Sequence, residues 1–142
     1  MEILKMPKLM KTLTCICLML PLVYSSDLLL LDSLTIQDAI KEHENIMIEF
    51  YAPWCIHCKA FAPHYEQAAT QLKLKGENIV MATIDGTSVP SELAAIWDVR
   101  SYPSLLFFKG GKFIEKYIGP RVTEQIVDYL IRKSKSEDKN DL

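Results

Sequence analysis

Two cysteines, Cys55 and Cys58, lie where a predicted strand gives way to a predicted helix. Residues 46–51 form an apolar run of strand length that a single carboxylate, Glu49, interrupts. Residues 59–75 carry apolar and small side chains at helical spacing. Residues three apart share one face of a helix, and this short separation suits a disulfide. Because a helix N-terminus stabilises a thiolate, we predict a redox site in which Cys55 is the nucleophile and Cys58 the resolving thiol.

The first 25 residues differ in composition from the rest and predict a signal peptide, 1–25. Lysines precede an almost purely apolar run at 12–23, and a small residue, Ser25, follows it. A transmembrane helix needs about 20 apolar residues, and this run is shorter. We therefore expect cleavage after Ser25 and no stable membrane insertion afterwards; an uncleaved anchor is the alternative.

Cleavage would leave Cys55 and Cys58 as the only cysteines, since Cys15 and Cys17 precede the cleavage point. A secreted scaffold held together by disulfides would carry several pairs, and this one pair closes a very short loop. We therefore assign the pair to chemistry. A Cys-x-x-Cys can also be half of a zinc site, but no second pair remains, so we expect no metal.

Strand-like and helical patterns alternate along the chain. The predicted elements are strand 27–31, a helix with Ile36, Ala39 and Ile40 on its apolar face, strand 46–51, helix 59–75, strand 78–84, helix 90–97, strands 105–108 and 113–118, and helix 123–133. Gly110 and Gly111 between the last two strands are a strong hairpin signal. This order predicts an α/β fold with a central mixed sheet flanked by helices on both faces.

Local signals add predictions about single elements. Thr35 with Asp38 resembles a capping box for the first helix, and Pro63 should kink helix 59–75. Ser88 is expected to begin the helix at 90–97. Leu93, Ile96 and Trp97 should then point from that helix into the core.

Residues 26–135 resemble the thioredoxin-fold catalytic domain of protein disulfide isomerases. The resemblance is carried, in the family's order, by EFYAPWCIHCK at 49–59, Tyr102-Pro103-Ser104, and YIGPR at 117–121. A bare Cys-x-x-Cys would be weak evidence, whereas this combination is specific. It implies a thiol-disulfide oxidoreductase and isomerase that forms and rearranges disulfide bonds in secretory proteins.

The resemblance also implies roles for single residues. Cys55 would be the exposed nucleophile, and Cys58 the buried thiol that releases trapped mixed disulfides. His57 would stabilise the thiolate and so favour disulfide donation over reduction. Glu49 would lie beneath Cys58 and relay its proton, unless it points to solvent at a strand edge. Arg121 would swing toward Cys58, or else be an ordinary surface arginine.

Four residues are implied to contact substrate, namely Trp54, Ile56, Tyr102 and Pro103, and Pro103 matches the family's cis-proline. Two positions depart from the family. Ile56 replaces a usual glycine and crowds the approach to Cys55. Thr83 replaces the lysine that usually accompanies the buried glutamate, so Glu49 should be protonated more readily.

The net charge of −2 gives no sign of nucleic-acid binding. No cofactor is expected, because the dithiol is itself the redox group. The predicted partners are cysteine-containing secretory polypeptides, with glutathione or an oxidase of the endoplasmic reticulum as redox partner. Residues 136–142 form a polar tail, and Lys139-Asn140-Asp141-Leu142 resembles a retrieval signal that a receptor could read. This predicts location in the lumen of the endoplasmic reticulum, or secretion if the signal is not read.

Two other functions stay open. One is a binding or chaperone subunit of the endoplasmic reticulum whose cysteine pair traps or docks a partner. The other is a secreted thioredoxin-like reductase, which would have a much more negative potential.

Overall fold

The computed structural model describes residues 25–136. Both predicted sorting signals, at 1–25 and 139–142, therefore lie outside the described residues, apart from Ser25. The elements are β1 (Leu29–Leu31), α1 (Ile36–Glu42), β2 (Asn45–Tyr51), α2 (Ile56–Leu74), β3 (Val80–Asp85), α3 (Ser91–Ile96), β4 (Ser104–Lys109), β5 (Lys112–Lys116) and α4 (Thr123–Lys135).

The strands form one five-stranded sheet in the order β1-β3-β2-β4-β5. β1, β3 and β2 are parallel, whereas β4 runs antiparallel to β2 and β5 antiparallel to β4. Gly110 and Gly111 turn the last hairpin with φ of 55° and 78°. Positive φ at both positions is what a tight two-residue hairpin requires. The predicted element order and mixed sheet are confirmed.

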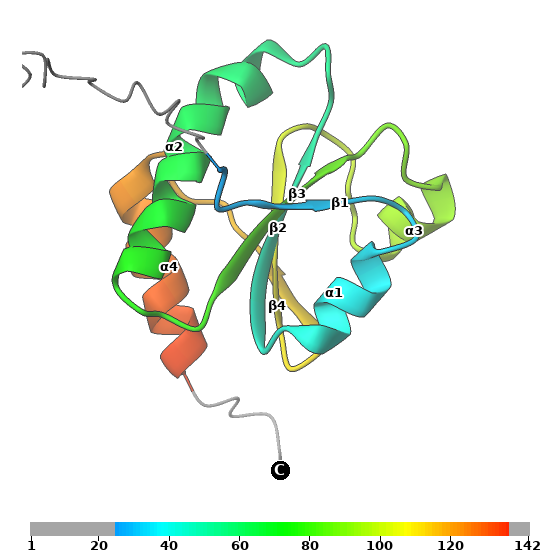
Figure 1. Cartoon of the computed structure of the whole chain (residues 1–142). Coiled ribbons are helices and arrows are strands. Elements are labelled where there is room, and N and C mark those ends of the chain that lie inside the picture. The colour runs from blue at the N-terminus through cyan, green and yellow to red at the C-terminus, as the bar shows by residue number, and fades with distance from the viewer. Residues whose placement is uncertain (1–24, 137–142) are drawn as a thin grey trace, which may run out of the picture.

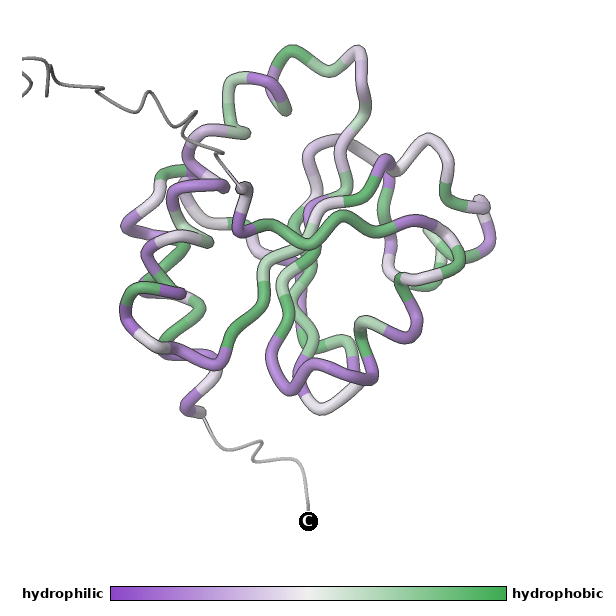
Figure 2. The backbone as a smooth tube through the Cα atoms, viewed as in Figure 1, coloured by the Kyte–Doolittle hydropathy of each residue, from purple (hydrophilic) through white to green (hydrophobic). Residues whose placement is uncertain are grey.

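Helices cover both faces of the sheet, with α2 and α4 on one side and α1 and α3 on the other (Figure 1). Successive strand residues point to opposite faces. In β2, Met47 therefore packs under α2 and α4, while Ile46 and Ile48 pack under α1 and α3. Hydrophobic residues accordingly follow the strands through the middle of the molecule (Figure 2).

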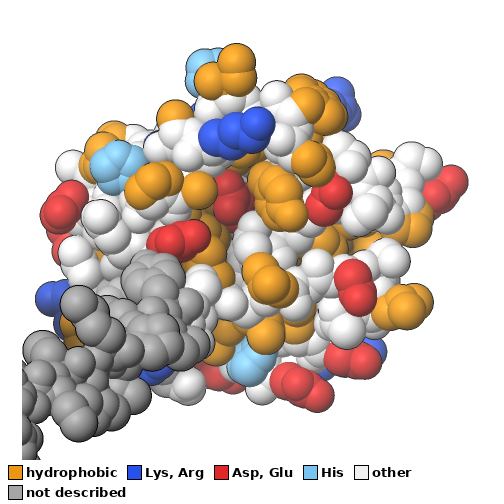
Figure 3. Space-filling view, turned by 45° about the horizontal axis from the view of Figure 1, so that its top comes forward, with side chains coloured by type: hydrophobic (Ala, Val, Ile, Leu, Met, Phe, Trp, Pro, Cys, Tyr) orange, Lys and Arg blue, Asp and Glu red, His pale blue; other side chains and the backbone are white. Residues whose placement is uncertain are grey.

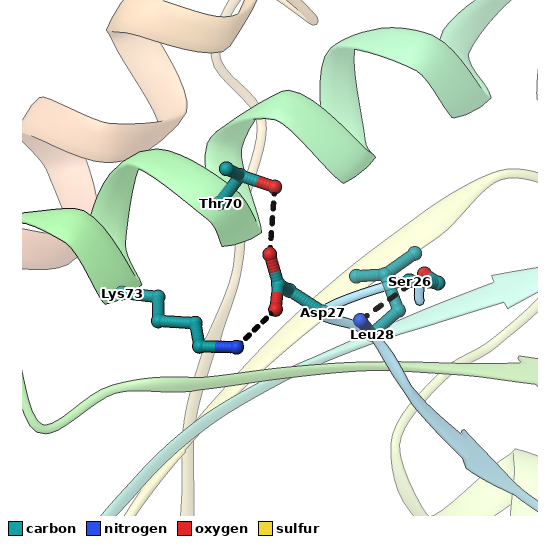
Figure 4. A network of polar contacts seen from close by, with 5 residues as sticks. All are labelled: Ser26, Asp27, Leu28, Thr70 and Lys73. Carbon is teal, nitrogen blue, oxygen red and sulfur yellow. Dashed lines mark hydrogen bonds and ion pairs between the residues drawn. The ribbon is translucent and has the colours of Figure 1, made fainter. Parts of the chain in front are cut away.

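The start of the domain is fastened to α2 by polar contacts (Figure 4). Thr70 Oγ1 donates to Asp27 Oδ2 at 2.9 Å, and Lys73 Nζ lies 2.6 Å from Asp27 Oδ1. The hydrogen bond from Lys73 holds the pKa of Asp27 below its usual value. These contacts join the residues before β1 to α2, and β1 itself pairs with β3 at the edge of the sheet.

The predicted Thr35–Asp38 capping box is wrong, because the reciprocal contacts lie three residues earlier. Asp32 Oδ1 accepts from the Thr35 N–H at 2.8 Å, and Thr35 Oγ1 accepts from the Asp32 N–H at 2.9 Å. The Thr35 side chain makes no forward cap, and its backbone is in the right-handed helical region. A capping side chain needs an extended backbone to reach the following N–H groups.

The prediction for α3 is wrong in two details. Ile96 is 71% exposed, because the face that packs on the core carries Leu93 and Trp97. Ser88 does not begin this helix: its hydroxyl donates to the Asp85 carbonyl, and Pro90 is the N-cap residue. α2 continues through Pro63 as one element. Within the described residues, no helix has the length and apolarity needed to cross a membrane.

Candidate active site

Cys55 and Cys58 meet at the junction between β2 and α2, as predicted. Cys55 is the N-cap residue of α2, with an extended backbone, and its sulfur accepts a hydrogen bond from the Cys58 N–H at 3.2 Å. Both residues are free cysteines. Donation from a helix N-terminus favours negative charge on the Cys55 sulfur. The sequence signal that found this pair is the spacing of two cysteines across the end of an apolar strand.

Cys55 is buried, contrary to the expectation of an exposed nucleophile. Only 6% of its surface is exposed, and its Sγ donates to the Tyr102 carbonyl at 3.7 Å. Tyr51 and Tyr102 pack against the small cluster that Cys55 forms with Ala52 and Cys58. Tyr102, which covers Cys55, lies 47 positions further along the chain, so local sequence patterns could not predict this contact.

Exposed side chains surround the buried sulfur. Trp54 is 71% and Ile56 77% exposed, and His57 is exposed as well. The Trp54 ring meets the Tyr102 ring edge-on, with centroids 6.2 Å apart. Figure 3 shows hydrophobic side chains beside acidic and basic ones on the face where α2 begins. An approaching disulfide therefore meets the exposed Trp54 and Ile56 side chains next to Cys55.

The Tyr102-Pro103 peptide bond is cis, in agreement with the resemblance at Pro103. Gly86, which the sequence analysis missed, leaves room for the neighbouring ring. A Cβ at this glycine would lie 2.3 Å from Cε1 of Tyr102. Gly86 thus permits Tyr102 to lie between the end of β3 and Trp54.

Arg121 contacts the loop at Pro103. It donates from an Nη atom to the Pro103 carbonyl at 3.2 Å, and the residue as a whole is exposed. The motion of Arg121 toward Cys58 stays a prediction.

Glu49 is buried inside the sheet, with 4% of its surface exposed, so the alternative of a solvent-facing edge residue is wrong. Thr83 lies opposite it on β3 and donates from Oγ1 to Glu49 Oε2 at 3.2 Å. Burial raises the pKa of Glu49 to about 7, although the Thr83 hydrogen bond and the charge of Arg121 oppose the rise. A carboxyl with this pKa can accept and return a proton near neutral pH.

Cys58 is a weaker acid than an ordinary cysteine for a physical reason. Burial, followed by its hydrogen bond with Cys55, raises the pKa of Cys58 to about 11. The thiol is therefore protonated at neutral pH and must lose its proton to act as a nucleophile.

A pocket of about 290 Å³ brings Glu49, Cys58 and Thr83 together with Lys59 and Glu66. Glu66 was missed by the sequence analysis. Its signal was available: Cys58, Ala62 and Glu66 are spaced four apart and so share one face of α2. The sequence does not show that this face of α2 lies over β2 and β3.

Within residues 25–136, no group of three or more His, Cys, Asp or Glu side chains is arranged to hold a metal ion.

The sequence of this chain is similar to those of known proteins. The family model for thioredoxin matches residues 29–132. Protein disulfide-isomerase 1 of Caenorhabditis elegans is 44% identical over 110 residues, which are 78% of this chain and 22% of that protein. Protein disulfide-isomerase of Arthroderma benhamiae is 46% identical over 110 residues, 78% of this chain and 20% of that protein. The chain thus spans about a fifth of the length of these relatives.

Solved structures share the fold. The first thioredoxin domain of mouse Protein disulfide-isomerase A4 superimposes with a TM-score of 0.72 at 34% identity, covering 83% of this chain and 84% of that domain. The zinc-bound form of human ERp44 gives a TM-score of 0.69 at 26% identity, over 76% of this chain and 31% of that one.

Proposed function

Because the chain belongs to the thioredoxin family, we propose that it is a thiol-disulfide oxidoreductase and isomerase acting through Cys55 and Cys58. One observation carries the proposal. Two reduced cysteines meet at the start of α2, with the Cys58 N–H donating to the Cys55 sulfur at 3.2 Å. This arrangement favours a thiolate on one cysteine and keeps a second thiol within reach of it.

In the first step, the Cys55 thiolate attacks one sulfur of a substrate disulfide. A sulfur–sulfur bond forms between Cys55 and the substrate, and the other substrate sulfur leaves as a thiolate. We expect Trp54, Ile56, Tyr102 and Pro103 to contact the polypeptide around the reacting sulfur. The exposure of Trp54 and Ile56, which flank Cys55 in the sequence, and the packing of Tyr102 against Cys55 support this role. Pro103 is buried and follows Tyr102 through a cis peptide bond.

In the release step, Glu49 takes the proton from Cys58, and the Cys58 thiolate attacks the Cys55 sulfur. The Cys55–substrate bond breaks, the Cys55–Cys58 disulfide forms, and the substrate leaves as a thiolate that water protonates. The substrate is reduced by two electrons, and the cysteine pair is oxidised by two. The high pKa of Cys58 and the near-neutral pKa of Glu49 support this assignment.

The reverse sequence donates a disulfide to a substrate with two thiols, and glutathione disulfide or an oxidase would then reoxidise the pair. We propose that His57, two residues after Cys55, favours this direction by stabilising the reduced state of the pair. We propose cysteine-containing secretory polypeptides as substrates. We also propose that residues 1–25 direct the chain into the secretory pathway and that 139–142 retain it in the endoplasmic reticulum.

The test is turnover of a scrambled disulfide protein by the full mature chain in a glutathione buffer. We expect many native molecules to be recovered per enzyme molecule, and none above background with Cys55→Ser. A binding subunit would instead recover or retain no more than one molecule per chain, and this result would overturn the proposal.

A further inference from the structure

We propose that Glu66 is a positioning residue which, together with Thr83, adjusts the pH at which Glu49 accepts the proton of Cys58. The inference deepens the proposed function and rests on it. Glu66 is not one of the site residues predicted from the sequence. Its charge would still influence how the release step depends on pH.

Glu66 is placed for this role by the face of α2 on which it lies. Cys58, Ala62 and Glu66 all line the pocket that also exposes Glu49. Glu66 is only half-buried, so it stays in contact with solvent although it lines the same pocket as the buried Glu49. The pocket, at about 290 Å³, has room for several water molecules.

Thr83 supplies the opposing influence. It is the residue directly opposite Glu49 on β3, and its hydroxyl donates to Glu49 Oε2 at 3.2 Å. A hydroxyl offers Glu49 one hydrogen bond and no positive charge. Thr83 thus favours ionised Glu49 through a hydrogen bond alone, and the charge of Arg121 also favours the ionised form, whereas Glu66 opposes it.

Other charged or titratable groups around Glu49 are accounted for. They lie on α2, on β2, and in the loop before α4, and they are Cys58, Lys59, Tyr51, Tyr65 and Arg121. Lys59 is exposed at the pocket rim. Arg121 donates to the Pro103 carbonyl, and its positive charge lowers the Glu49 pKa more strongly than Glu66 raises it. Tyr65 is buried and bonded to backbone carbonyls, so its hydroxyl stays neutral. Glu66 is thus the negative charge of the pocket that acts on Glu49, and its charge raises the Glu49 pKa.

The direction in which each neighbour shifts the ionisation of Glu49 follows from its charge or its hydrogen bond. A negative Glu66 disfavours the ionised form of Glu49, whereas the Thr83 hydroxyl favours it. Only ionised Glu49 can take the Cys58 proton, after which the protonated carboxyl returns that proton to pocket water. Neutralising Glu66 should therefore let the release step begin at lower pH, and removing the Thr83 hydroxyl should delay it to higher pH.

The experiment measures both steps in single-turnover reactions, quenched with acid across pH, on a disulfide-containing peptide. We expect Glu66→Gln to lower the pH midpoint of mixed-disulfide release by about half a pH unit, and Thr83→Val to raise it by a similar amount. The rate of the first attack by Cys55 should keep the wild-type midpoint in both variants. Glu92→Gln is the matched control, because it removes the same charge from an exposed residue of α3 on the opposite face of the sheet.

A second readout does not depend on activity. The carboxyl ¹³C resonance of Glu49, assigned by its absence in Glu49→Gln, should titrate at lower pH in Glu66→Gln and at higher pH in Thr83→Val. Midpoints in Glu66→Gln that match those of Glu92→Gln, by kinetics and by resonance, would overturn the inference. Failure of the proposed function would look different: the first attack itself would be missing, while the resonance would still decide the role of Glu66.

Discussion

At Glu49, the chemistry of the site and the stability of the fold depend on the same proton. Burial raises the pKa of this carboxyl from its ordinary value of 4.5 to about 7. Between these values the folded chain holds a proton that the unfolded chain has lost. Stability therefore falls as pH rises through this window, because the native state binds more protons than the unfolded state.

We predict that Glu49→Gln removes this fall in stability with rising pH. A rise from 4.5 to about 7, at about 1.4 kcal/mol for each pKa unit, corresponds to about 3 kcal/mol. The free energy of unfolding of the reduced protein, measured in urea at pH 5 and pH 8, should fall by about 2 to 3 kcal/mol more in the wild type than in the variant. If the free energy of unfolding changed equally with pH in the two proteins, the raised pKa of Glu49 in the folded state would be contradicted.

Single residues were predictable where their partners are close in sequence. Cys55 and Cys58 followed from spacing alone, and a carboxylate in an apolar strand drew attention to Glu49. The burial of Cys55 could not be predicted, because Tyr102 covers it from a distant loop. That Glu66 shares a pocket with Glu49 and Thr83 depends on how α2 packs on β2 and β3, and this packing cannot be read from the sequence.

At the scale of elements, α2 is anchored to the sheet by a polar group within an apolar core. Tyr65 is fully buried, and its hydroxyl lies 3.0 Å from the carbonyls of both Met47 and Ala82. These carbonyls belong to β2 and β3, so one side chain ties the site-bearing helix to the two strands beneath it. Loss of the hydroxyl would leave buried acceptors without this donor.

We therefore predict that Tyr65→Phe lowers the free energy of unfolding by about 1 to 2 kcal/mol, as measured by urea denaturation of the reduced protein. Tyr117→Phe is the control, because its hydroxyl donates to the carbonyl of Pro120 at an exposed position. An equal loss in the two variants would argue against a special anchoring role for Tyr65.

Element order could be predicted well, and element ends less well. Apolar runs and helical spacing located the strands, the helices and the Gly110-Gly111 hairpin. The cap of α1 was misplaced because Asp32 and Thr35 satisfy each other before the helix begins. Ile96 was assigned to the core although α3 packs through Leu93 and Trp97, a choice that depends on how a short helix sits on the sheet.

At the scale of the whole molecule, the redox pair lies where the parallel strands β2 and β3 end. β2 ends at Tyr51 and β3 at Asp85, so Cys55, Gly86 and Tyr102 gather at one edge of the sheet. The carboxyl ends of parallel strands are where α/β folds commonly place their sites. The two apolar cores on either face hold this edge in place.

The central claim is that Cys55 attacks substrate disulfides and Cys58 resolves the product. Its most direct test is covalent trapping of a disulfide-containing substrate by Cys58→Ser in the mature chain, with the linkage site read by mass spectrometry. We predict a stable mixed disulfide on Cys55 in Cys58→Ser, and none in Cys55→Ser or in the variant that lacks both cysteines. Trapping that persists in Cys55→Ser, or an adduct that fails to form in Cys58→Ser, would contradict the account.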